Sequence, residues 1–323
     1  MNALRFLKRR LVHSVLLLAT ISVLTFGIAQ LAPGTFLDEM RVNPQISAQT
    51  INAIRMQYGL DQPLPVRYLR WIASAATGGF GYSLAYNMPV SKLLWTRLGN
   101  TLLLGTTAML IGWTLALPLG IWSAFRSQSW IDRVNSAVST LLLGTPELAL
   151  AMFLMFTAAH FAMLPTGGMS SLPTEGAAWF AVPDMIRHLL IPAVALALTA
   201  SPILFRHVRS AMLEAWNSPF VNAAKGHGIG NKRLLMQYAL PAAANPLISL
   251  FGLSLAGLLS GSFLIEIITG WPGLGPLFIN AVFARDLHIV MAVVMLFSVL
   301  LVFANLASDL FLYALDPRVR AEC

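Results

Sequence analysis

Long runs of uncharged, apolar residues are the feature that most constrains how this chain can fold. A bilayer core about 30 Å thick is crossed by roughly 20 apolar residues in helical form. Soluble domains carry about 25% charged residues, whereas only 11% of these 323 residues are charged and 57% are hydrophobic. A soluble enzyme, a disulfide-rich secreted domain and a disordered chain are excluded, and an all-α polytopic membrane protein is favoured. Six membrane-spanning runs are predicted: 11–31, 101–125, 134–163, 188–205, 246–268 and 289–315.

The basic residues predict that both chain ends lie on the cytoplasmic side. Short cytoplasmic loops carry an excess of Lys and Arg, and here the two ends and the loops after the second and fourth runs hold 13 of 21. The other short loops hold only Arg187 and Arg285. The net charge of +8 therefore indicates membrane orientation more than nucleic-acid binding. The 13 residues are Arg5, Lys8, Arg9, Arg10, Arg126, Arg133, Arg206, Arg209, Lys225, Lys232, Arg233, Arg318 and Arg320.

The long segment between the first and second runs holds six more basic residues and is predicted to form a small helical subdomain outside the cytoplasm. An apolar helical face that includes Ile51 ends at Gly59. A second short helix opens near Pro65, carries Leu69 and ends at Gly78. The expected organisation is the N-terminus with span one in 1–32, the outer subdomain in 33–100, and a five-span core in 101–323.

The loop at about 206–241, between the fourth and fifth runs, carries the most specific pattern. Ser218-Pro219 is typical of the start of a helix, and Gly226 and Gly228 can end that helix because both accept positive φ. Asn231 is expected to cap a second helix over 232–240, and Pro241 to stop it. An ordinary basic surface loop is the alternative interpretation.

The spacing within this loop resembles a known motif. Asn222-Ala223-Ala224 is followed by three residues, Gly228, nine residues and then Tyr238-Ala239-Leu240-Pro241. This resembles the E-A-A, three residues, G, nine residues, I-x-L-P loop of ABC-importer permeases. Other segments resemble the dipeptide, oligopeptide and nickel permease subfamily: Arg9-Arg10, Pro33-Gly34, Tyr58 to Pro63, Arg67-Tyr68-Leu69, Leu264 to Gly275, Asn305, Asp309 and Asp316 to Arg320.

The resemblance implies a type I ABC-importer permease fold in a bacterial cytoplasmic membrane. It implies a heterodimer with a second homologous permease, two cytoplasmic ABC ATPase subunits and an extracytoplasmic solute-binding protein. The chain would bind no cofactor, with ATP and Mg on the ATPases, and it has no G-x-x-x-x-G-K-[ST] phosphate loop. The ATPase contact would be a coupling helix and its surroundings: Phe220, Asn222, Ala223, Ala224, Lys225, Gly228, Leu240 and Pro241.

The sequence departs from the family pattern at several places. Asn222 stands where the motif usually has an acid, and Tyr238 replaces an aliphatic residue. Gly226 adds a second glycine before the motif glycine. Gly79 and Thr35 stand where the outer subdomain and the segment after the first span often carry Asp. These differences put the details of the docking surface in question without removing the helix–turn–helix.

Three residues are candidates for the translocation path. Glu147 follows Pro146 within the third run, where it either attracts a cationic substrate group or is satisfied by water or the partner permease. Glu266 is expected near the outer end of span five, where a structural or gating carboxylate can be hydrated. Trp271 is expected in an outer turn, facing the binding protein and pore mouth or anchoring in the membrane interface. Prolines 118, 146, 192 and 202 are expected to kink or interrupt their helices.

Several substrates and two other functional classes stay open at this stage. Di- or oligopeptides are the first choice of cargo, and nickel or another metal chelate is the alternative. A self-contained channel or ion-coupled transporter would use Glu147 and Glu266 for the ion. An intramembrane hydrolase lacks an H-E-x-x-H or G-x-S-x-G motif. The single cysteine, Cys323, excludes an internal disulfide, and no spacing of His, Asp and Glu makes a metal site.

Overall fold

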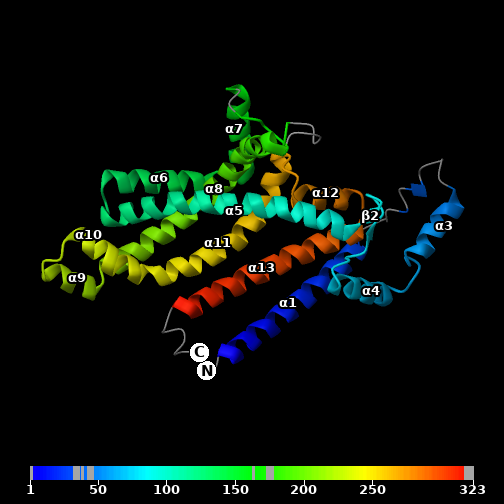
Figure 1. Cartoon of the computed structure of the whole chain (residues 1–323), viewed down its shortest axis with the longest axis horizontal. Helices are drawn as coiled ribbons and strands as arrows, with labels where there is room; N and C mark the ends of the chain where they lie inside the picture. The colour runs from blue at the N-terminus through cyan, green and yellow to red at the C-terminus, as the bar shows by residue number, and fades with distance from the viewer. Residues whose placement is uncertain are drawn as a thin grey trace. The chain divides into compact units, whose positions relative to one another are not determined.

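The computed structural model describes residues 3–31, 37, 40–41, 47–161, 164–171 and 178–315. Pro33-Gly34, Thr35 and Asp316 to Arg320, which were compared with the family pattern, and the single cysteine Cys323 lie outside this part of the chain. The described residues are almost entirely helical, as predicted (Figure 1). In order, the elements are α1 (Ala3–Leu31), α3 (Ala48–Gln57), α4 (Leu64–Ala76), β1 (Tyr82–Ser83), β2 (Met88–Pro89), α5 (Val90–Phe125), α6 (Trp130–Gly144), α7 (Glu147–His160), α8 (Ala178–Trp216), α9 (Pro219–Gly226), α10 (Asn231–Leu234), a π-helix η1 (Leu235–Ala239), α11 (Leu240–Thr269), α12 (Leu274–Phe283) and α13 (Leu287–Leu315).

The predicted spans are present, although several are longer than expected. Within the described residues, five helical segments are long and apolar enough to cross a membrane, and the pair α6 and α7, bent by 103°, makes a sixth if it counts as one span. The fourth run, expected at 188–205, extends over Val182–Trp216, and the fifth begins at Asn231. Charged residues near the ends of these helices caused the sequence-based bounds to fall short.

The prolines differ in their effects. Pro118, Pro192 and Pro202 lie inside continuous helices, so the expected interruption does not occur there. Pro146 does precede a break, since Thr145 before it takes an extended backbone conformation with ψ 122°. A proline disfavours the helical conformation of the residue preceding it, which explains the end of α6.

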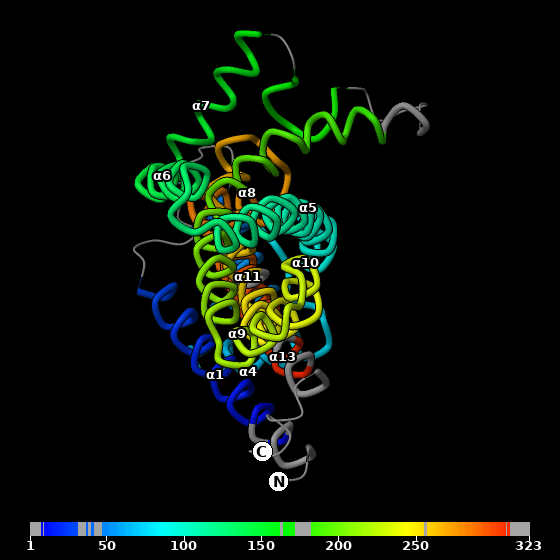
Figure 2. The backbone as a smooth tube through the Cα atoms, turned by 90° about the vertical axis from the view of Figure 1, so that its left-hand side faces the viewer, coloured from blue at the N-terminus to red at the C-terminus, as the bar shows by residue number. Residues whose placement is uncertain are grey.

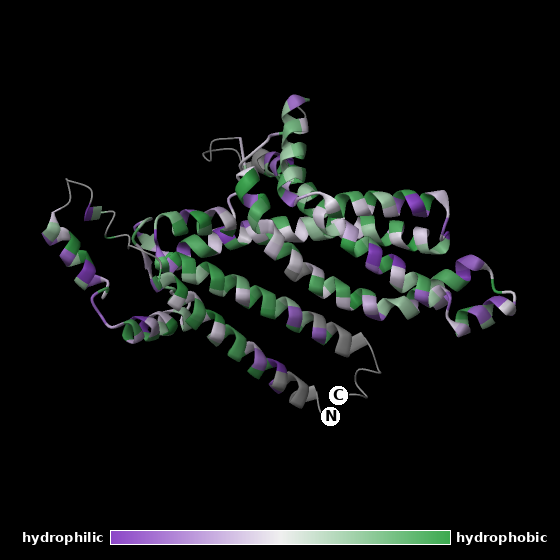
Figure 3. Cartoon of the chain, turned by 180° about the vertical axis from the view of Figure 1, so that it is seen from behind, coloured by the Kyte–Doolittle hydropathy of each residue, from purple (hydrophilic) through white to green (hydrophobic). Residues whose placement is uncertain are grey.

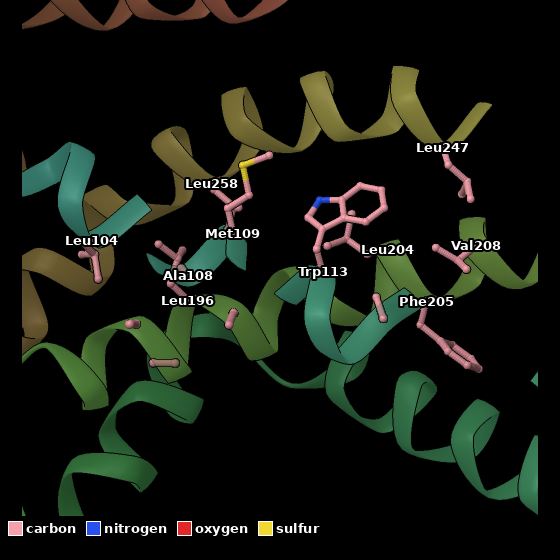
Figure 4. Close-up of a cluster of buried hydrophobic side chains, with 14 of the residues drawn as sticks. Leu104, Ala108, Met109, Trp113, Leu196, Leu204, Phe205, Val208, Leu247 and Leu258 are labelled. Atoms are coloured by element: carbon pink, nitrogen blue, oxygen red, sulfur yellow. The ribbon is translucent and has the colours of Figure 1, made fainter. Parts of the chain in front are cut away.

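The chain forms two compact units, of which the first holds Met1–Arg10, Thr101–Trp271 and Leu300–Cys323. Its core is built from α5, α8 and α11, with the indole of Trp113 in α5 lying among leucines of its neighbours (Figure 4). The indole Nε1 donates a hydrogen bond to Ser254 Oγ at 2.9 Å. An ion pair of 3.0 Å joins Arg10 Nη1 to Asp309 Oδ2. Small residues allow close helix packing, because a Cβ at Gly120 would lie 2.6 Å from Val208 Cγ1.

The second unit holds Leu11–Asn100 and Pro272–Val299. Its two short helices α3 and α4 confirm the predicted pair, with Ile51 buried and positive φ at Gly59 and Gly78. The buried residue of α4 is Trp71 rather than Leu69, which is exposed. The hairpin β1–β2 was not predicted; Ser83 at its start donates a 2.7 Å hydrogen bond to the Asp286 carboxylate.

Candidate functional site

The predicted helix over 218–226 is present as α9. Ser218 precedes it with φ −65° and ψ 150°, and Pro219 occupies the first turn, where a missing N–H costs nothing. The Ser218 hydroxyl does not cap α9 but donates to the carbonyl of Ala215 at 2.6 Å. Only Gly228 takes positive φ, at +79°, whereas Gly226 is the last helical residue. The turn therefore depends on one glycine, and the expectation for Gly226 was wrong.

The second half of the loop differs more from the prediction. Asn231 is the first residue of α10 and Gly230 takes the N-cap position. Pro241 does not stop a helix, because it lies in the first turn of α11, directly after the π-helix η1. Pro241 has no N–H to donate to the preceding turn, and the wider π turn of η1 lets the chain continue from α10 into α11. The segment that holds α9 and α10, called here the coupling loop, thus runs into α11 without an irregular stretch between them.

The two arms of the loop pack against each other through a small apolar cluster. Val221, Ala224 and Leu234 are buried, and Trp216, Ile229 and Tyr238 pack around them. Tyr238, which replaces the aliphatic residue of the motif, therefore contributes to the packing of this cluster. Ala224 faces this cluster rather than outward, so its smallness serves packing within the loop. Figures 1 and 2 show α9 and α10 side by side at one end of the first unit.

The outer face of the loop carries most of the residues predicted to contact an ATPase. Phe220, Asn222, Ala223, Lys225 and Gly228 are exposed. Leu240 is half-buried and Pro241 is exposed at the start of α11. The Asn222 side chain turns back, and its Nδ2 donates to the carbonyl of Asn217 at 3.1 Å. The loop thus presents one aromatic residue, one cation and a strip of small residues.

A buried ion pair supports the loop from α6, and the sequence analysis did not find it. Asp132 accepts two hydrogen bonds from Arg209 in α8, at 2.6 and 2.8 Å, and a third of 2.9 Å from the backbone of Gln128. Its side chain is buried, whereas that of Arg209 is partly exposed. The available signal was an acid three residues after Ser129, which precedes α6. The pair fixes α6 to the helix that leads directly into α9.

Glu147 lies at the break between α6 and α7, as the first residue of α7. Its side chain is half-buried. A Cβ at Gly261 in α11 would lie 3.0 Å from Glu147 Oε1 and 3.4 Å from Leu196 in α8. The absence of a side chain at position 261 therefore leaves the space in which the carboxylate sits, against α8 and α11.

Glu266 and Trp271 lie at the predicted positions, in the last turn of α11 and in the turn after it, but both are buried rather than exposed. Glu266 is fully buried in α11, so hydration at an outer helix end does not explain it. Trp271 is fully buried in the core of the first unit, and it is neither an exposed loop residue nor an interface anchor. Gly270, with φ +66°, ends α11 and turns the chain so that the indole enters the core. Among the described residues, no three His, Cys, Asp or Glu side chains group closely enough to hold a metal ion.

Two family models together match nearly the whole chain. The binding-protein-dependent transport system inner membrane component matches residues 116–321, and the N-terminal region of the same membrane component matches residues 3–105. The chain belongs to this family. It is a permease subunit of a binding-protein-dependent ABC importer, and its spans are those of a multi-pass inner-membrane component.

Full-length relatives of the permease include several proteins named for peptides. A putative peptide permease of Brucella suis is 32% identical over 98% of this chain and 99% of its own length. The oligopeptide transport system permease AppB of Bacillus subtilis is 35% identical over 97% and 98%. The glutathione transport system permease GsiC of Salmonella paratyphi A is 30% identical over 98% and 99%.

Solved structures support the type I fold of the permease. A chain of the inward-facing methionine ABC transporter MetNI aligns with a TM-score of 0.57, 19% identity, and coverage of 69% of this chain and 96% of that one. A chain of an amino acid ABC transporter with histidines aligns with a TM-score of 0.53 and 20% identity, over 69% and 94%. At this identity the likeness concerns the fold alone.

Proposed function

We propose that this permease imports di- and oligopeptides across the bacterial cytoplasmic membrane. The near full-length similarity to permeases named for peptides carries the proposal. The importer would pair this chain with a second homologous permease, two cytoplasmic ABC ATPase subunits and an extracytoplasmic solute-binding protein. Both termini of this chain would be cytoplasmic. ATP and Mg would bind to the ATPases, and this chain would contribute no catalytic group.

The coupling loop supplies the mechanical link in this proposal. α9 is short and packs on α10 through Val221 and Leu234. It follows the long helix α8, and α10 and η1 connect it to the long helix α11. A displacement of α9 by a closing ATPase would therefore move α8 and α11 as rigid bodies. The Asp132–Arg209 pair would carry the same displacement to α6. Inward- and outward-facing states would then interconvert around the break at Pro146.

The test is uptake by the complete importer reconstituted in proteoliposomes with its binding protein. Labelled di- to tetrapeptides should accumulate only when ATP and both ATPase subunits are present. A nickel chelate should not compete with the peptide. Uptake by this chain without ATPases, or uptake of the nickel chelate in place of peptides, would contradict the proposal.

Glu147 is proposed to face the path and to attract the amino terminus of a peptide. Its half-buried carboxylate lies against α8 and α11, where a negative charge is costly without a cationic partner. Replacement Glu147→Gln keeps the shape and removes the charge, so uptake of peptides with a free amino terminus should fall about tenfold. Uptake of the N-acetylated peptides should change little. Measured transport rates of both substrates, with the exposed Glu214→Gln as control, check this; an equal loss for both substrates argues for a structural role.

A further inference from the structure

The loop that joins α8 to α11 has an unusual charge content. Residues 217–238, called here the coupling surface, contain no Asp or Glu. They contain three cations, Lys225, Lys232 and Arg233, together with His227, and all four are exposed. Figure 3 shows hydrophilic residues on the two helices, α9 and α10, on either side of the turn. The coupling surface is therefore positive.

These cations are not neutralised within the described part of the chain. Arg10–Asp309, His188–Asp184 and Arg209–Asp132 are ion pairs there, and none of them includes a residue of the coupling surface. Arg233 donates from Nε to Gln237 at 2.8 Å, which orients its guanidinium without cancelling the charge. Asp132, the buried acid in the first turn of α6, is already bound by Arg209 in α8. The positive charge is consequently available to a partner.

Apolar exposure accompanies the charge. Phe220 is 50% exposed and Met236 is 55% exposed, although the opposite side of α9 is packed in a cluster. Ala223, three residues after Phe220 in α9, and Gly228 are exposed and small, so a protein backbone can approach them closely. A helix that binds lipid presents a broad face of large apolar residues, whereas α9 presents a single aromatic ring. Its exposed surface has the composition of a protein interface with one central anchor.

We infer that the ATPase surface receiving this loop is acidic around an apolar pocket that holds Phe220. This inference rests on the proposed coupling to an ATPase and specifies the chemistry of that contact. In the motif that the loop resembles, position 222 usually carries an acid, but here Asn222 is neutral and turned toward Asn217. The charged side chains of the coupling surface are therefore all cationic, and complementary charge on the ATPase gives both attraction and selection against ATPases with a basic surface.

The experiment measures retention of the ATPase subunits on the affinity-tagged, complete importer as the NaCl concentration rises. Wild-type retention should fall with salt, because screening shortens the range of exposed charges. The variant K225E/K232E/R233E should weaken ATPase binding at least about tenfold at low salt, since it replaces three attractions with repulsions. Phe220→Ala should weaken binding while leaving the salt dependence unchanged. Arg133→Glu, an exposed charge reversal in α6, is the matched control and should bind as wild type does.

The outcomes separate this inference from the proposed function. If the wild-type importer retains no ATPase at any salt concentration, the ATPase-coupled function itself fails. If the wild type and the triple variant retain the ATPases equally, or if retention is insensitive to salt, the inference of an acidic ATPase surface is wrong. The proposed coupling of the permease to an ATPase is not contradicted by that result. Binding of the importer to vesicles of phosphatidylserine and phosphatidylcholine is measured in parallel. Loss of vesicle binding in the triple variant with unchanged ATPase retention assigns the cations to lipid headgroups and overturns the inference.

Discussion

Asp132 shows how one residue connects distant parts of the permease. Its carboxylate accepts from Arg209, 77 positions later in the chain, and from the backbone of Gln128, whose φ is +65°. Positive φ is costly for a residue other than glycine, so the hydrogen bond at Gln128 helps to hold the turn before α6. The Asp132 carboxylate thus connects the turn before α6 with helices α6 and α8.

Replacing one member of this pair should destabilise the permease by about 2 kcal/mol, because the remaining side chain loses its charge-assisted hydrogen bonds. Asp132→Ala and Arg209→Ala should each show this loss, and the double variant should lose less than the sum of the two. Thermal unfolding of the purified protein in detergent measures it. Arg133→Ala, at an exposed neighbour, should have little effect; additive losses in the double variant would show that the two side chains do not interact.

The α9–α10 element shows which parts of the structure the sequence predicts. The helix over 218–226 and the turn at Gly228 followed from proline and glycine positions, since these act through their own backbone. The continuation through Pro241 did not follow, because it depends on the π-helix before it, and π-helices have no sequence signal of their own. The burial of Trp271 and the position of Glu147 beside Gly261 depend on packing between distant segments, which no local pattern contains.

The two glycines of the coupling loop should respond differently to substitution. Gly228→Ala forces a side chain into positive φ at a cost of about 1 kcal/mol, and Gly228→Asp adds an acid to the cationic surface. Both variants should lower ATP-driven uptake, and Gly228→Asp should abolish it. Substrate binding by the solute-binding protein should stay intact in both. Gly226→Ala should be tolerated, because Gly226 is helical with open space around it. Uptake assays on the three variants provide the measurement, and normal uptake with Gly228→Asp would remove the coupling role from this loop.

Helix packing makes a second prediction at this scale, for two glycines of α5. A Cβ at Gly120 would lie 2.6 Å from Val208 Cγ1 and 3.2 Å from the backbone nitrogen of Arg209, so Gly120→Ala should cost about 1–3 kcal/mol. Gly99 has nothing within 4 Å, and Gly99→Ala should be neutral or stabilising by about 0.5–1 kcal/mol. Thermal unfolding in detergent compares them; equal stability of the two variants would mean that α5 and α8 separate easily at Gly120.

At the scale of the whole molecule, the distribution of Lys and Arg predicts sidedness, and Cys323 allows a direct test. Since it is the single cysteine in 323 residues, a membrane-impermeant maleimide reports the location of the C-terminus without mutation. Labelling should occur in inverted membrane vesicles and not in intact spheroplasts, because the basic residues hold both ends in the cytoplasm. Asp61→Cys in a Cys323→Ser background, at an exposed position in the predicted outer segment, should label in spheroplasts instead. Labelling of both positions from the same side would require an even number of spans between them, and α6 and α7 would then form a re-entrant pair rather than one crossing.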